Sequence, residues 1–101
     1  MDFDTTGAML HVARERLEQR KDAGHAESAV ETMAAAITKA VADYITSHRD
    51  AEFTLTEITD FVDTRMRMAS VLEPNASAAQ IASVHDATEA ATRLAVERMS
   101  A

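Results

Sequence analysis

Four side chains that could bind a metal ion share one face of a predicted helix near the N-terminus. His11, Glu15, Glu18 and Asp22 follow one another at spacings of four, three and four residues, which places them on the same side of an α-helix. Carboxylates and imidazoles are ligands for hard and borderline divalent cations. The pattern therefore predicts a candidate metal site. The simpler alternative is that these side chains lie on a solvent-exposed helix face and form local ion pairs.

A second group of ionisable side chains is acidic throughout. Five acidic residues lie between positions 50 and 63: Asp50, Glu52, Glu57, Asp60 and Asp63. The same segment has no lysine or arginine, so its local charge is −5. Such a field repels the phosphates of nucleic acids and attracts basic protein surfaces. We expect these side chains to form an acidic binding face for a protein partner with a basic surface.

Arg65 is a cation within an otherwise apolar stripe. On a helical wheel it falls between Phe61, Met68 and Leu72. A buried guanidinium without a partner is very unfavourable. Arg65 must therefore reach solvent along its apolar stem, pair with a carboxylate on another helix, or contact a partner or an anion. The sequence leaves these alternatives open.

Four helices are predicted to position these side chains. Their approximate ranges are residues 5–23, 26–48, 54–72 and 77–99. Only two glycines, Gly7 and Gly24, and one proline, Pro74, occur in the chain, so few residues interrupt helical structure. Short connections make consecutive helices antiparallel neighbours. We expect an all-α single domain over residues 1–101, a small antiparallel helical bundle of about four helices in two helical hairpins.

Capping signals and apolar stripes support the four helices. Three pairs have the spacing of a capping box: Ser28 with Glu31, Thr54 with Glu57, and Ser77 with Gln80. The predicted core positions recur every three or four residues: Met9, Leu10, Ala13, Leu17, Val30, Met33, Ala34, Ile37, Val41, Tyr44, Ile45, Ile58, Phe61, Val62, Met68, Ala69, Leu72, Ile81, Val84, Thr88, Ala91, Ala95 and Met99.

Composition narrows the class of protein. The chain has 101 residues, a formal net charge of −7 and no cysteine. These features exclude disulfides and thiolate chemistry and disfavour nucleic-acid binding. No apolar run is long enough to span a membrane, and the first residues lack a basic signal-peptide region. We expect a cytoplasmic protein without a cofactor.

The favoured function is protein binding without catalysis, as a regulator, adaptor or inhibitor of bacterial or phage type. A homodimer is also expected, because the basic cluster of Arg14, Arg16, Arg20 and Lys21 matches the acidic segment of a second copy. The alternative is a DNA-binding regulator, since residues 37–62 resemble the entry to a helix-turn-helix module. The third hypothesis is a small helical enzyme or a metal-binding bundle.

Overall fold

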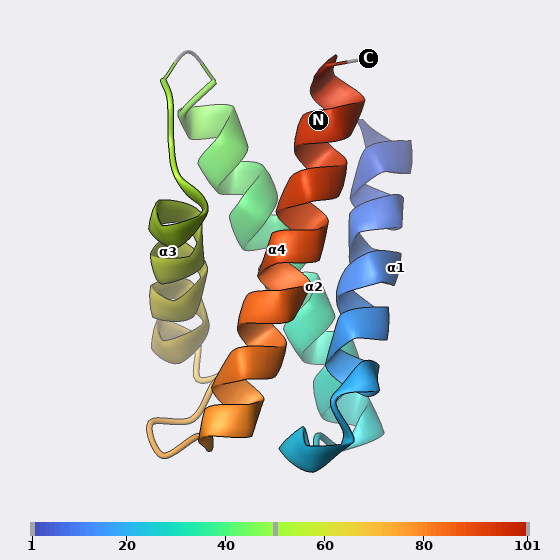
Figure 1. Cartoon of the computed structure of the whole chain (residues 1–101), viewed down its shortest axis with the longest axis vertical. Coiled ribbons are helices and arrows are strands. Elements are labelled where there is room, and N and C mark those ends of the chain that lie inside the picture. The colour runs from blue at the N-terminus through green and yellow to red at the C-terminus, as the bar shows by residue number, and fades with distance from the viewer. Residues whose placement is uncertain (1, 50, 101) are drawn as a thin grey trace.

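The protein is a four-helix bundle. A computed structural model describes residues 2–49 and 51–100 (Figure 1). Its elements are α1 (Phe3–Gln19), the short 3-10 helix η1 (Lys21–Ala23), α2 (Glu27–Ser47), α3 (Leu55–Met68) and α4 (Ala78–Ser100). Consecutive α-helices run in opposite directions, and no strand occurs within the described ranges. The predicted all-α fold is confirmed.

The helix starts follow their capping side chains in three cases. Thr54 accepts a hydrogen bond from the backbone N–H of Glu57 at 3.1 Å, and Ser77 exchanges two capping hydrogen bonds with Gln80, at 3.0 and 3.1 Å. The first helix begins earlier than residue 5, because the Asp2 carboxylate accepts from the backbone N–H of Thr5. These side chains satisfy N–H groups that the first turn leaves without a helical partner.

The predicted capping box of Ser28 with Glu31 is wrong. Helix α2 begins at Glu27, and its N-cap is Ala26, which makes no side-chain capping bond. Ser28 therefore already lies within the first turn. The core stripe of this helix is as predicted, since the side chains from Val30 to Ile45 that were assigned to it are buried.

Helices α1 and α3 end before the predicted positions. The α-helical part of α1 stops at Gln19, and Gly24 caps η1 with a left-handed φ of 64°. Helix α3 stops at Met68, because Ser70 adopts a φ of 60° and the N–H of Val71 donates to the carbonyl of Met66 at 2.8 Å. A left-handed residue just after a helix satisfies the last carbonyl groups and turns the chain.

The buried stripe of α3 also differs from the predicted one, since it is formed by Ile58, Val62 and Met66. Met66 is 1% exposed and Met68 is 81% exposed, so the prediction that Met68 belongs to the core is wrong. Ala69 is exposed as well. Leu72 is buried as predicted, but it reaches the core from the turn after the helix. In α4, Val84, Thr88, Ala91 and Ala95 are buried as predicted, whereas Met99 is 50% exposed.

The first and last helices lie side by side along most of their length (Figure 1). Helix α1 contributes Met9, Ala13 and Leu17 to the core. The core residues of α4 include Ala87 and Ala91, which have no exposed surface. Small side chains allow two helices to approach closely. Helix α1 therefore packs on its own chain, within the described residues, and closes the bundle.

Candidate functional site

The acidic residues of the predicted binding face lie on α3 and on the segment before it. Glu52, Glu57 and Asp60 are exposed; we call these three the acidic surface. Asp63 is only partly exposed, because it turns toward α4, where the His85 ring nitrogen Nε2 lies 3.3 Å from its carboxylate. Asp50, the fifth predicted residue, lies outside the described residues. Three of the four predicted residues that the structure describes are therefore exposed, and Asp63 contacts α4.

Core packing and hydrogen bonds position α3, which carries Glu57 and Asp60. Ile58, Val62 and Met66 anchor α3 in the core with almost no exposed surface. The Glu57 carboxylate accepts hydrogen bonds from the hydroxyls of Thr54, at 3.3 Å, and Tyr44, at 3.5 Å. Burial, with the neighbouring Glu57 carboxylate, raises the pKa of Tyr44, so this phenol remains a hydrogen-bond donor.

No lysine or arginine among residues 2–49 and 51–100 forms an ion pair with Glu52, Glu57 or Asp60. Several other carboxylates have such partners. Glu31 pairs with Arg14 at 3.1 Å, and Asp86 pairs with Arg20 at 3.2 Å. The negative potential of the acidic surface is therefore not neutralised by contacts within the described chain.

Arg65 is paired within its own chain. Its Nη2 atom donates to the Asp43 carboxylate on α2 at 2.8 Å, and its guanidinium lies 5.3 Å from the centre of the Phe61 ring. The bonded guanidinium lowers the pKa of the Asp43 carboxyl below its usual range. Of the alternatives left open by the sequence, the internal ion pair is the one formed, so Arg65 joins α3 to α2.

The candidate metal ligands are not brought together. His11 pairs with Glu15 one turn away, at 2.7 Å. Asp22 leaves the shared face because the α-helix ends at Gln19 and Asp22 lies in η1. Within the described ranges, no group of three or more metal-ligating side chains could hold an ion. The predicted metal site of His11, Glu15, Glu18 and Asp22 therefore does not form. All four side chains are exposed to solvent, as the simpler alternative expects.

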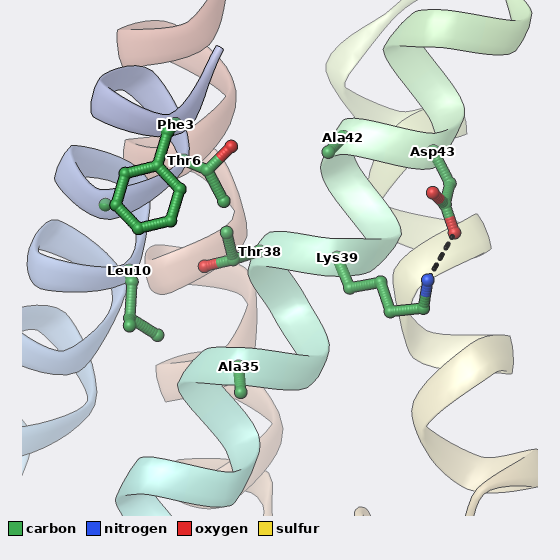
Figure 2. Close-up of a pocket in the computed structure, with 9 residues that line it drawn as sticks. Phe3, Thr6, Leu10, Ala35, Thr38, Lys39, Ala42 and Asp43 are labelled. Carbon is green, nitrogen blue, oxygen red and sulfur yellow. Dashed lines mark ion pairs between the residues drawn. The ribbon is translucent and has the colours of Figure 1, made fainter. Parts of the chain in front are cut away.

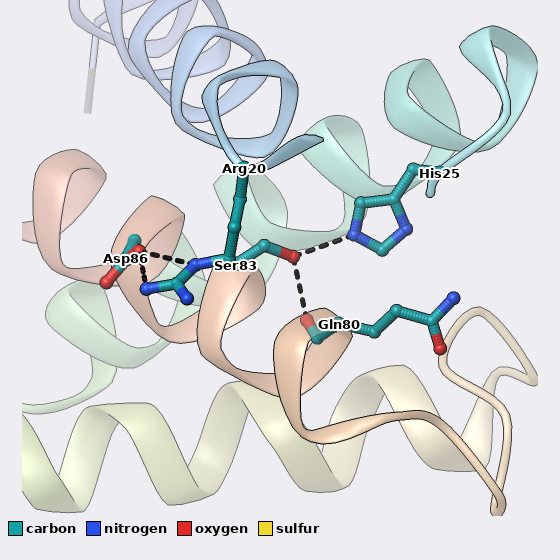
Figure 3. A network of polar contacts seen from close by, with 5 residues as sticks. All are labelled: Arg20, His25, Gln80, Ser83 and Asp86. Carbon is teal, nitrogen blue, oxygen red and sulfur yellow. Dashed lines mark hydrogen bonds and ion pairs between the residues drawn. The ribbon is translucent and has the colours of Figure 1, made fainter. Parts of the chain in front are cut away.

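A polar network that sequence analysis missed joins the α1–α2 connection to α4 (Figure 3). The His25 ring nitrogen Nε2 lies 2.7 Å from the Ser83 hydroxyl, which donates to the backbone carbonyl of Gln80 at 2.7 Å. Arg20 adds a link to Asp86 on the same helix. His25 and Ser83 are separated by 58 positions in the sequence, so no local signal could have paired them.

The Ser83–His25 pair is structural and does not have the arrangement of a nucleophile with its base. The Ser83 proton is committed to the Gln80 carbonyl, so the shared hydrogen bond requires His25 to donate. A base must instead accept the proton of its nucleophile. Ser83 is also fully buried, which denies a substrate access to its oxygen. Burial lowers the pKa of His25, which favours its neutral form.

A shallow apolar groove between α1 and α2 is the other feature that sequence analysis missed (Figure 2). Its volume is about 390 Å³, and its walls include Phe3 and Leu10 on α1 and Ala35 and Ala42 on α2. Phe3 is 91% exposed. The two apolar residues of α1 were visible in the sequence, but the groove exists only because α2 lies beside them.

Comparison with known proteins adds no functional assignment. The chain matches no protein-family model, and neither curated protein sequences nor solved structures give a match. Its function is therefore inferred from the surfaces of the bundle.

Proposed function

We propose that this protein is a non-enzymatic interaction module that binds a basic surface of another protein through the acidic surface. One observation carries the proposal: Glu52, Glu57 and Asp60 are each exposed, and none has a lysine or arginine partner among the described residues. Complementary potentials accelerate association and exclude partners of the wrong charge. A regulator, adaptor or inhibitor acting in the cytoplasm is the corresponding biological role.

The rest of the described chain supports a binding role over catalysis. The Ser83 hydroxyl is buried and already hydrogen-bonded, and the Arg65 guanidinium is bonded to Asp43. These groups stabilise contacts between helices. In addition, no helix within the described ranges has both the length and the apolar character needed to cross a bilayer.

The DNA-binding alternative gains no support from α3. This helix would open the module, yet Glu57 and Asp60 are exposed on it. Carboxylates at that position oppose the phosphate contacts on which duplex affinity depends. If the protein retarded a DNA duplex in a gel at low salt, DNA binding would be favoured over protein binding.

Charge reversal tests the proposal. The double variant Glu52→Lys/Asp60→Lys should lose capture of its basic partner from native-host lysate, with binding about tenfold or more weaker once the partner is purified. Neither residue caps a helix or belongs to the core, so the bundle should remain folded. Asp63 is a poorer choice because it contacts His85.

A matched control distinguishes the effect of the acidic surface on binding from the effect of total charge. Glu73→Lys/Glu97→Lys changes the net charge by the same amount at two other exposed positions. Retained capture by this control, with loss in the acidic-surface variant, supports the proposal. Equal capture by wild type and by Glu52→Lys/Asp60→Lys would remove the acidic surface from consideration.

A further inference from the structure

Two hollows on the surface of α2 adjoin one another, and they differ in polarity. The first is the apolar groove toward α1, with a volume of about 390 Å³. The second has a volume of about 490 Å³, and Arg65 on α3 forms part of its wall. Thr6, Ala42 and Asp43 line both hollows. The apolar groove therefore opens, at this junction, onto a polar surface.

The junction carries a positive charge in a chain that is acidic overall. The Asp43 carboxylate is shared by two cations, since Arg65 Nη2 lies 2.8 Å from it and Lys39 Nζ lies 3.7 Å from it. Among the described residues that line the two hollows, no other lysine, arginine or acid occurs. Two cations and one carboxylate leave a net charge of +1. Because 73% of the Lys39 side chain is exposed, its ammonium has donors left for a second anionic group.

The wall of the apolar groove also contains a hydroxyl that has no hydrogen-bond partner. Thr38 is 3% exposed, and its Oγ1 atom has no partner within the described residues. Figure 2 shows this oxygen directed toward α1. Several other threonines donate to the backbone carbonyl four residues earlier: Thr32, Thr64, Thr88 and Thr92. A buried hydroxyl without a partner is unfavourable, so a ligand oxygen that reached Thr38 would stabilise the complex.

We propose that the groove binds a free single-chain fatty acid. Its carboxylate lies beside Thr38 and Lys39, which are adjacent on α2, and its alkyl chain lies against Phe3 and Leu10 on α1. Phe3 is 91% exposed, and an alkyl chain would cover this apolar surface. The volume of the groove falls within the range of about 300–1,000 Å³ that is usual for small-molecule sites.

The charge of the ligand follows from the junction. A carboxylate is attracted by the net positive charge there, a neutral alcohol of the same length lacks this attraction, and an alkylammonium ion is repelled. The proposal is independent of the binding of a basic protein, because the groove and the acidic surface share no residue. Each can therefore fail without the other.

The experiment is isothermal titration calorimetry of the full chain with sodium decanoate. Wild type should bind decanoate saturably, with one site per chain. Affinity should rise by about two- to fourfold for each methylene added from hexanoate to decanoate, because each CH₂ is removed from water. Decanol should bind more weakly than decanoate, and decylammonium more weakly still. Equal affinity for decanol and decanoate would overturn the proposal.

Gly7→Leu tests whether the ligand occupies the groove. Gly7 lines the groove, and a Cβ atom at this position would have no other atom within 4 Å. The bundle should therefore accept the leucine, while the side chain takes space from the ligand and weakens decanoate binding by about tenfold or more. Gln19→Leu adds the same side chain at an exposed position on α1 and should leave the affinity unchanged. Equal affinity of wild type and Gly7→Leu would overturn the proposal.

Two further variants test the carboxylate contacts. Lys39→Gln should weaken decanoate binding by about two- to fivefold, as expected for an exposed ion pair, and should leave decanol binding unchanged. The matched control is Lys21→Gln, which makes the same charge change at an exposed position of η1. Thr38→Val should weaken decanoate binding while stabilising the free protein, because it removes the hydroxyl that has no partner.

Two other outcomes would also overturn the proposal. One is the absence of saturable decanoate binding at ligand concentrations up to about 5 mM. The other is sedimentation of the protein with phosphatidylglycerol vesicles without any binding of free decanoate, which would assign the groove to a membrane surface.

Discussion

Shortening Met66 should destabilise the bundle, whereas shortening Met68 should not. The two methionines belong to the last turn of α3, but Met66 is 1% exposed and Met68 is 81% exposed. Replacing a buried methionine by alanine costs about 2–5 kcal/mol, because buried contacts are lost and a cavity remains. Proteins of this size have about 5–15 kcal/mol of total stability. Met66→Ala should therefore remove a substantial fraction of it, and Met68→Ala should change it by less than about 0.5 kcal/mol.

The assay is urea unfolding followed by circular dichroism, with thermal melts in parallel. A loss of 2 kcal/mol or more should lower Tm by roughly 10 °C or more in a domain of this length. Met66→Leu serves as the near-isosteric control and should cost less than about 1.5 kcal/mol. If Met68→Ala proved the more damaging variant, α3 would have to be rotated relative to the core, and the arrangement of the acidic surface would fail with it.

Three further predictions concern capping, pH and salt. Thr54→Ala should cost about 1 kcal/mol in chemical unfolding, because it removes the N-cap of α3, whereas Thr64→Ala on the exposed side of the same helix should be nearly neutral. Burial lowers the pKa of His25 from its usual 6.5, so the unfolded chain binds more protons and stability should fall as pH drops through about 6.5 toward the lowered pKa. His25→Gln should flatten this part of a pH series of unfolding curves, and an unchanged slope would contradict the assignment. Added salt should weaken capture of a basic partner, because ions screen the charges of the acidic surface; capture measured at low and at high salt would test this direction.

The number and type of the helices could be predicted because their signals are local. Thr54 and Ser77 cap the turns that follow them, and the apolar period of α2 survives unchanged as its buried stripe. The end of α3 could not be predicted in the same way. Ser70 adopts the left-handed conformation that ends the helix. Glycine usually occupies such a position, and a serine there gives no signal in the sequence. The apolar periodicity therefore predicts a helix that continues to Leu72.

The candidate sites were less predictable because they depend on contacts between distant residues. Arg65 was recognised as a side chain that needs a partner, but 22 positions separate it from Asp43, and several acids were equally suitable. The His25–Ser83 contact and the groove beside Phe3 arise only when α1, α2 and α4 are packed. The charge of the acidic surface can be read directly from the sequence. The contact of Asp63 with His85 cannot, because it depends on where α4 packs.

The packing of α1 on α4 has a consequence for how the bundle opens. Each sequential hairpin pairs neighbouring helices, yet α1 has a larger interface with α4 than with its hairpin partner α2. Separating the hairpins would therefore remove the larger of these two interfaces of α1. Local opening of either hairpin is therefore coupled to the other, and the domain should behave as one cooperative unit. Backbone amides in the middle of α1 and α4 should exchange with deuterium together, at a rate set by global unfolding.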